Sequence, residues 1–176
     1  MGQFIRLNRT EIYQGKIINL VQDKLQTPVG NLVNWDLVIH NGASAIIPVD
    51  SQGNILLVKQ YRNAADSVVL EIPAGKLEGN EDPRICAMRE LEEETGYSSD
   101  DIEFLMDFYP AIGYSNEKIY VYVAKNLTKT KQDLDEDEFV EVEKYSLDEV
   151  IRMIMNGEIK DSKTISAILA YKIKYE

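Results

Sequence analysis

Apolar and polar residues alternate along much of the first third of the chain. Between residues 32 and 40, every second position from Val33 to Ile39 is apolar, which predicts a strand with one buried face. A second strand is expected at 16–25, and the turn-forming residues 27–31 between them indicate a hairpin. A further strand pair is expected at 43–49 and 55–62, around a polar segment whose Gly53 tolerates left-handed backbone.

The pattern changes after the short apolar strand expected at 68–72, which ends at Pro73. Residues 74–80 are typical of a loop. A helix is expected from Pro83 to Thr95, because acidic residues precede it, Pro favours the first turn and Gly96 is a common stop. More strands are expected at 102–109 and 118–124. The acidic segment 133–143 is typical of a solvated edge, with a strand near residues 139–142.

Two more helices are expected near the C-terminus. Ser146 and Glu149 form the capping box of a helix that Gly157 ends, and Asp161 or Ser162 caps the last one. Strands and helices mixed in this order predict an α/β protein, with a substantial sheet covered by helices.

The composition of the chain indicates where the protein is located and which classes of partner it does not bind. The 176 residues suit one domain, and no apolar run approaches the ~20 residues of a membrane span. The first residues lack the apolar stretch of a secretory signal, and the only cysteine, Cys86, excludes an internal disulfide and is typical of a small buried side chain, so a cytoplasmic location is expected. The net charge of −11 argues against nucleic acid and anionic membranes as partners. A phosphate ligand would need cations or arginines to reverse the local field.

Three glutamates of the helix at 83–95 suggest such cations. Glu90, Glu93 and Glu94 fall within an arc of ~100° on one helix face, where like charges repel. A divalent cation such as Mg²⁺ removes this repulsion, because it favours carboxylate oxygens. The alternative is a merely solvated acidic face, which three glutamates alone leave open.

The residues around these glutamates favour the metal site. The stretch GKLEGNEDPRICAMRELEEETGY, residues 75–97, has the spacing G-x5-E-x7-R-E-L-x-E-E-x-G. Gly75 and Gly96 permit backbone angles that other residues resist. Arg89 lies one turn before Glu93 and can orient it, and Leu91 faces the core. The fixed positions are Gly75, Glu81, Arg89, Glu90, Leu91, Glu93, Glu94 and Gly96.

This stretch resembles the signature of the Nudix hydrolases, with Tyr97 in place of the usual aliphatic residue. The resemblance implies an α/β/α sandwich with a mixed sheet, and metal-assisted hydrolysis of a nucleoside diphosphate linked to another group. It implies Glu90 and Glu94 as principal ligands of Mg²⁺, for which Mn²⁺ can substitute, with Glu93 close by. The carbonyl of Ala74 is implied as a further ligand, and Glu81 with Arg89 as the residues that hold loop and helix together.

From about Gly15 onward the chain is similar to the ADP-ribose pyrophosphatase group of this family. The matching segments are VNWDLVIHNGASAIIPV, ILLVKQYR, LEIPAGKLE, the loop at 109–117, LDEDEFVEVE and DSKTISAI. The resemblance implies that Trp35 stacks on the adenine, often from a partner subunit, and that Arg62 faces the diphosphate. It places Glu71 near the substrate and gives Glu117 the role of holding or deprotonating the attacking water, a role that Glu93 could take instead.

Each of these residues also has a structural interpretation. Trp35 could pack in the core, Arg62 could form a surface ion pair, and Glu117 could be a solvated loop residue. His40 is better explained as a hydrogen-bonded scaffold residue. The loop at 109–117 departs from many members of the group, because Ile112 stands where they have Pro and Pro110 comes two residues earlier.

The sequence pattern predicts an N-terminal β-hairpin region at 1–40, and the resemblance implies that this region forms a homodimer and that a Nudix hydrolase domain follows at 41–176. The reaction that the resemblance implies is hydrolysis of ADP-ribose to AMP and ribose 5-phosphate. Three alternatives stay open: another nucleoside diphosphate sugar or a coenzyme as substrate, an inactive regulatory module of the same fold, and an interaction protein with an acidic face.

Overall fold

The structure, a computed structural model, describes residues 2–134 and 138–175. Residues 135–137, within the expected acidic segment, lie outside the described residues. The chain forms two compact units, Met1–Gly42 with Tyr109–Lys118 and Ala43–Phe108 with Ile119–Glu176.

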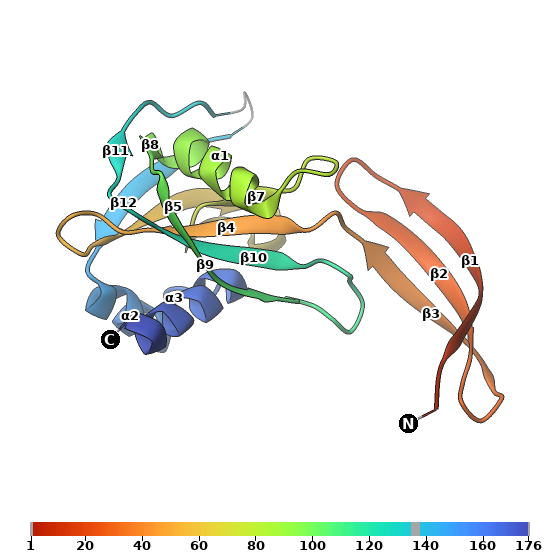
Figure 1. The fold of residues 1–176 in the computed structure, drawn as a ribbon. Coiled ribbons are helices and arrows are strands. Elements are labelled where there is room, and N and C mark those ends of the chain that lie inside the picture. Colours follow the sequence, from red (N-terminus) through yellow and green to blue (C-terminus); the bar gives the residue numbers. More distant parts are fainter. Residues whose placement is uncertain (1, 135–137, 176) are drawn as a thin grey trace. The chain divides into compact units, whose positions relative to one another are not determined.

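The described residues form three α-helices, a short 3₁₀ helix and the strands drawn in Figure 1. In chain order the elements are β1 (Ile5–Gln14), β2 (Asn19–Gln26), β3 (Leu32–Ile39), β4 (Ala43–Pro48), β5 (Ile55–Arg62), η1 (Asn63–Ala65), β6 (Ser67–Glu71), β7 (Ala74–Lys76), α1 (Pro83–Thr95), β8 (Tyr97–Ser98), β9 (Asp101–Phe108), β10 (Ile119–Lys125), β11 (Thr128–Lys129), β12 (Glu141–Tyr145), α2 (Leu147–Met155) and α3 (Ser162–Tyr175).

The first unit contains a three-stranded antiparallel sheet in the order β1-β2-β3 (Figure 1). The hairpin expected from the alternating pattern is the β2–β3 pair. Before this hairpin, where the sequence pattern predicted no element, lies strand β1, whose residues are all exposed. Opposite Asp23 of β2, Arg9 of β1 donates two hydrogen bonds of 2.7 Å to its carboxylate, and they hold the pKa of Asp23 below its usual value. This charged pair ties the outer strand to the hairpin.

The second unit is a sandwich, because alternate residues of its central strands face opposite sides. In β4, Ala45 and Ile47 pack with buried residues of α2 and α3, whereas Ile46 packs with Ala87 and Leu91 of α1. Figure 1 shows α1 on one side of β4 and β10, and α2 with α3 on the other. The period of two in strands thereby produces two cores, one on each face of the sheet. The predicted helix-covered α/β sandwich is confirmed.

The sheet of this sandwich is mixed. Its order is β7-β4-β10-β9, with β10 parallel to β4 and the other pairs antiparallel. A second, antiparallel sheet has the order β12-β5-β6, and β11 pairs with β8. The loop expected at 74–80 begins with strand β7, which the sequence pattern did not predict. Its pairing with β4 brings the signature's first glycine to the edge of the sheet.

Local signals set the ends of the helices. Asp82 caps α1 by accepting a hydrogen bond of 2.7 Å from the Arg84 amide, and Gly96 ends it with φ 69°. The predicted capping box of α2 is present, with Ser146 and Glu149 bonded reciprocally. Asp161, rather than Ser162, caps α3, because its carboxylate accepts the Thr164 amide at 2.9 Å. In the part of the chain that the structure describes, no helix is long and apolar enough to cross a membrane.

Candidate active site

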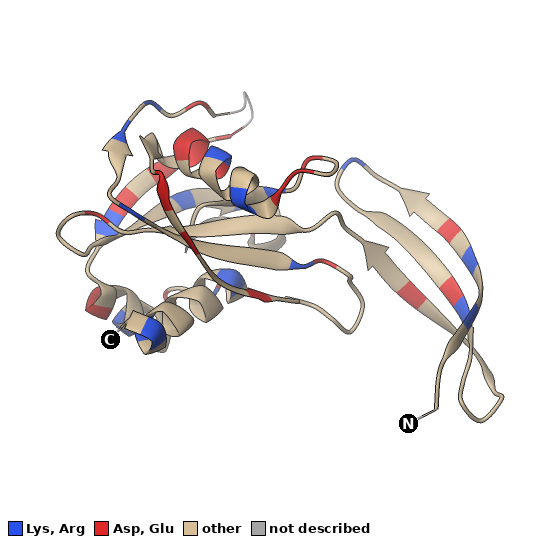
Figure 2. Ribbon diagram, viewed as in Figure 1, with Lys and Arg blue, Asp and Glu red and all other residues tan. Residues whose placement is uncertain are grey.

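The glutamates of α1 have distinct environments. Leu91 and Ala87 bury one side of the helix against the sheet, and Glu90 and Glu94 are buried as well. Glu93 is more exposed and directs its carboxylate to Arg89. Figure 2 shows acidic residues gathered over the C-terminal half of α1. The solvated acidic face left open by the sequence therefore does not describe Glu90 and Glu94.

Both buried carboxylates lie against the backbone of β7. The amide of Ala74 donates a hydrogen bond of 2.9 Å to Oε2 of Glu94. At Gly75, a Cβ atom would lie only 1.8 Å from Oε1 of Glu90. Only glycine therefore leaves room for the Glu90 carboxylate beside the strand. The β4–β7 pairing, in which Ser44 is opposite Gly75, holds this backbone in place.

The two carboxylates lack full charge compensation. Burial raises the pKa of Glu94 to about 8, and the charge of Glu90 adds to the effect. Burial also raises the pKa of Glu90 to about 7, against the lowering influence of Arg89. A divalent cation would favour the ionised form of both groups.

These residues fit a hard metal ion. The candidate donors are the oxygens of Glu90 and Glu94 and the carbonyl of Ala74, all oxygen ligands of the kind that Mg²⁺ prefers. No group of three or more His, Cys, Asp or Glu side chains within residues 2–134 and 138–175 is arranged to hold a metal by itself. The candidate set thus combines two carboxylates with backbone.

Arg89 connects the loop before α1 with the helix. Its Nε and Nη2 donate to the two oxygens of Glu81 at 3.1 Å each, and Nη1 donates to Glu90 at 2.6 Å and to Glu93 at 2.9 Å. Glu81 also accepts the Glu78 amide at 3.1 Å. These bonds fit the joining role that the resemblance implied for Glu81 and Arg89.

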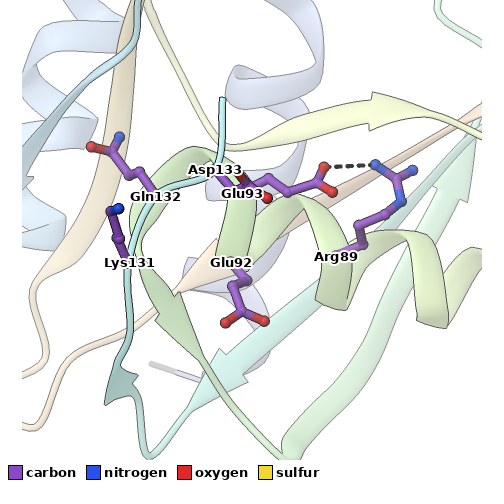
Figure 3. A pocket seen from close by; sticks show the side chains of 6 residues that line it. All are labelled: Arg89, Glu92, Glu93, Lys131, Gln132 and Asp133. Carbon is purple, nitrogen blue, oxygen red and sulfur yellow. Dashed lines mark hydrogen bonds and ion pairs between the residues drawn. The ribbon is translucent and has the colours of Figure 1, made fainter. Parts of the chain in front are cut away.

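A hollow adjoins this network on the Glu93 side of the helix. Figure 3 shows Glu93 directed toward Arg89, with the segment 131–133 alongside. The amide of Asp133 donates to the Glu93 carbonyl at 3.1 Å, and the Gln132 side chain donates to the Glu94 carbonyl at 2.6 Å. The lining residues are Arg89, Glu92, Glu93, Lys131, Gln132 and Asp133. Glu90 and Glu94 do not line it, so the hollow is a neighbour of the candidate metal site.

Arg62 and Glu71 form an ion pair. Arg62 donates from Nε to one oxygen of Glu71 at 2.7 Å and from Nη2 to the other at 3.0 Å. Burial favours protonation of Glu71, but the bonds from Arg62 and the charge of Lys163 hold its pKa below the usual value. Arg62 thus forms the ion pair that was its structural alternative, yet 44% of its side chain stays exposed. Its charge also interacts with that of Glu94.

Glu117 and Trp35 belong to the first unit. The Glu117 amide donates to Ser115 at 3.1 Å, and its carboxylate lies 3.7 Å from Nδ1 of His40. Asn116 donates to the His40 carbonyl at 3.3 Å and accepts the His40 amide at 2.8 Å, which fastens the loop to the end of β3. His40 is thus a hydrogen-bonded scaffold residue, as expected.

Trp35 is 53% exposed, and its ring centroid lies 5.3 Å from that of Phe4. The alternative of core packing is therefore wrong for this side chain within the single chain.

Comparison with known proteins establishes the family. Residues 39–167, more than half of the chain, match the family model of the NUDIX domain, so the chain belongs to the Nudix family. It is 42% identical over 160 residues to the methanol dehydrogenase activator of Bacillus methanolicus, covering 90% of this chain and 86% of the relative. It is 38% identical over 168 residues to the ADP-ribose pyrophosphatase of Bacillus subtilis (strain 168), covering 94% and 91%.

A crystal structure of an ADP compounds hydrolase has the same fold. It superposes with a TM-score of 0.88 at 21% identity and covers 98% of this chain and 94% of that one. Hydrolases of the Nudix family generally use divalent metals and act on small nucleotide substrates. The fold expected from the signature is confirmed.

Proposed function

We propose that this chain is a Mg²⁺-dependent Nudix pyrophosphohydrolase that converts ADP-ribose to AMP and ribose 5-phosphate, with Mn²⁺ as a substitute metal. The observation that carries the proposal is the pair of buried carboxylates, Glu90 and Glu94, packed against Ala74 and Gly75 with too little positive charge around them. The family and the 38% identity to an ADP-ribose pyrophosphatase support the choice of substrate.

Each residue then has a chemical task. Glu90, Glu94 and the Ala74 carbonyl hold the metal, which offsets the negative charge of the diphosphate when bound. Glu117 accepts a proton from the attacking water, unless Glu93 does so. The water oxygen bonds to phosphorus and the bridging P–O bond breaks, which leaves AMP and ribose 5-phosphate. Arg62 binds the diphosphate beside Glu71, and Trp35 stacks on the adenine.

Product identification tests the proposal directly. The purified protein is incubated with Mg²⁺ and ADP-ribose, and AMP and ribose 5-phosphate are measured by chromatography. A panel of nucleoside diphosphate sugars and coenzymes, compared by kcat/KM, ranks ADP-ribose against the alternative substrates. Glu94→Gln is the control for a contaminating hydrolase. Absence of AMP at saturating Mg²⁺ overturns the proposal, and a larger kcat/KM for another substrate overturns its substrate.

A second candidate function follows from the 42% identity to a methanol dehydrogenase activator. Under this candidate, the chain raises the turnover of a methanol dehydrogenase. The test adds the purified protein, or its Glu94→Gln variant, to that dehydrogenase and follows the oxidation of methanol. No acceleration by the parent protein excludes the candidate. Acceleration by the parent but not by the variant would link activation to the glutamates of α1.

The N-terminal region at 1–40 is proposed to form the contacts of a homodimer. The exposed apolar residues of β1 and the exposed Trp35 support this assignment. The small-molecule substrate, the lack of nucleic acid or membrane partners and the cytoplasmic location stay predictions.

A further inference from the structure

A charged cluster outside the signature joins three elements of the second unit. Arg62 ends β5, Glu71 ends β6, and Asp161 and Lys163 lie at the start of α3. The ammonium group of Lys163 contacts Oε2 of Glu71 and lies 3.1 Å from Oδ2 of Asp161. Lys163 is therefore placed between the cap of α3 and the carboxylate that binds Arg62.

The centre of this cluster is the Glu71 carboxylate, which is 2% exposed. One oxygen accepts Arg62 Nε, and the other accepts both Arg62 Nη2 and Lys163. Two cations, one from β5 and one from α3, thus bind one buried anion and determine the direction of its plane. Because a guanidinium matches a carboxylate in a planar fork, the direction of that plane also determines the direction of Arg62.

The remaining edge of Arg62 is available to a ligand. Nε and Nη2 bond to Glu71, whereas Nη1 has no hydrogen-bond partner among the residues that the structure describes. The Arg62 side chain is 44% exposed and that of Lys163 only 12%. Lys163 is therefore largely shielded from solvent, and Arg62 presents the more accessible charge.

We propose that Lys163 is a positioning residue for the reaction: through Glu71 it fixes the Arg62 guanidinium so that its free edge binds the substrate diphosphate. The inference rests on the proposed function. Lys163 itself does not contact substrate. Without Lys163, the buried carboxylate loses one of the two cations that compensate its burial, and Arg62 becomes free to leave the bidentate geometry.

If Lys163 only attached the start of α3 to β6, its loss should lower stability and leave substrate binding unchanged. The start of α3 has another link to β6, in which the Ile72 amide donates to Thr164 Oγ1 at 2.9 Å and Thr164 donates to Asp161 at 2.6 Å. Thr164→Val removes this link without touching Arg62. It is the matched control for lost helix attachment, and it should lower the melting temperature without changing KM.

The kinetic test uses Lys163→Met and Lys163→Arg with ADP-ribose and saturating Mg²⁺. Lys163→Met should raise KM about 10- to 100-fold, by analogy with the loss of outer partners that orient metal ligands, with a smaller change in kcat. Lys163→Arg keeps the charge and should recover most of the loss. In an Arg62→Met background, Lys163→Met should have no further effect on KM, because its effect passes through Arg62. An unchanged KM in Lys163→Met, or an undiminished effect in that background, overturns the inference.

A spectroscopic test does not depend on activity. The ¹⁵N–¹H signal of Arg62 Nε is recorded in the ligand-free protein and assigned by its loss in Arg62→Lys. Lys163→Met should exchange this proton with water at least ~10-fold faster, as expected when a local structure opens more often, and Lys163→Arg and Thr164→Val should not. Equal exchange in the parent and Lys163→Met overturns the inference. A parent without hydrolysis overturns the proposed function instead, and the exchange rates still decide whether Lys163 holds Arg62.

Discussion

The buried carboxylate of Glu94 receives a hydrogen bond from the Ala74 amide, and that of Glu90 receives one from Arg89. If these groups hold the metal, Glu90→Gln or Glu94→Gln should lower kcat at least ~100-fold, the scale of losing one electrostatic stabiliser of the transition state. Each metal-free variant should melt at the temperature of the parent or higher, because glutamine keeps the shape but cannot ionise where burial disfavours the charged form. Steady-state kinetics and thermal melts test this prediction. Near-normal turnover of either variant at saturating Mg²⁺ contradicts the metal assignment.

The same two residues predict how the stability of the metal-free protein depends on pH. Burial raises the pKa of Glu94 to about 8 and that of Glu90 to about 7, from the value of 4.5 that an exposed glutamate has in an unfolded chain. Between pH of about 4.5 and 8, the folded chain binds more protons than the unfolded chain does. The free energy of unfolding therefore falls as pH rises through this range. We expect the melting temperature to drop by roughly 4 °C or more from pH 6 to pH 8.5, at about 2–4 °C per kcal/mol for a chain of this size.

Saturating Mg²⁺ should reduce this drop, because the metal favours the ionised carboxylates. Glu94→Gln should flatten the pH profile of the metal-free protein. Melts of parent and variant across pH 5–9 provide the comparison. An identical slope in both proteins would show that other groups dominate the dependence on pH.

Glu117 and Glu93 are the two candidates for the group that accepts the proton of water. The Glu93 carboxylate accepts a hydrogen bond from Arg89 at 2.9 Å, whereas Glu117 lies in a loop fastened by Asn116. Glu117→Gln keeps the shape but removes the basic oxygen, so kcat should fall ~10²–10⁴-fold with little change in substrate affinity. Single-turnover rates of Glu117→Gln and Glu93→Gln are compared. A far larger loss in Glu93→Gln would assign the base to Glu93.

Local and distant residue pairs differ in how far the sequence predicts them. The side of α1 shared by Glu90 and Glu94 follows from helical geometry, and Arg89 can reach Glu93 because it lies one turn away. The contact between Lys163 and Glu71 joins residues 92 positions apart, and no periodic pattern encodes such a contact. The matching segment DSKTISAI contained Lys163, but only the fold gives this residue a partner.

At the scale of elements, the short strand β7 holds the backbone against both buried carboxylates. A Cβ atom at Gly75 would lie 1.8 Å from Oε1 of Glu90, so Gly75→Ala must displace the strand or the carboxylate. We expect metal affinity to fall about 10–100-fold, as for other losses of support around a metal ligand. Titration calorimetry with Mg²⁺ or Mn²⁺ measures it. Gly113→Ala, where a Cβ meets open space, is the control and should bind the metal like the parent. Equal affinity in both variants would argue against a metal site beside Gly75.

The elements that the sequence pattern missed depend on pairing rather than on their own residues. Strand β1 is exposed at every position, so it lacks the buried face that alternation would reveal, and it exists because it pairs with β2. Strand β7 has three residues and is defined by its register with β4. Helices were predicted closely because Asp82, Gly96 and Ser146 carry their own end signals.

At the scale of the whole molecule, the net charge of −11 and a diphosphate substrate are compatible only if cations enter the site. The buried carboxylates of α1 would bind some of them, and Arg62 supplies a fixed positive charge. The charge of Arg62 is in turn held by Glu71 and Lys163. Substrate binding should therefore depend on the divalent metal and on Arg62 together.

The oligomeric state of the protein is a prediction, because the structure contains a single chain. Large apolar side chains of the first unit are exposed, among them Ile5, Leu7 and Ile12 of β1 and Trp35 of β3. Exposed apolar surface of this kind is typical of an interface, and identical chains most often associate as symmetric dimers.

We expect sedimentation of the parent protein to give twice the chain mass of 20.1 kDa at micromolar concentration. Leu7→Glu with Ile12→Glu should shift the particles toward single chains, because a charge buried in an interface is costly. The control is Thr10→Glu, at an exposed polar position of the same strand, which should leave the mass unchanged. Single chains throughout the micromolar range of the parent would contradict the dimer, and with it the contribution of Trp35 to a neighbouring subunit.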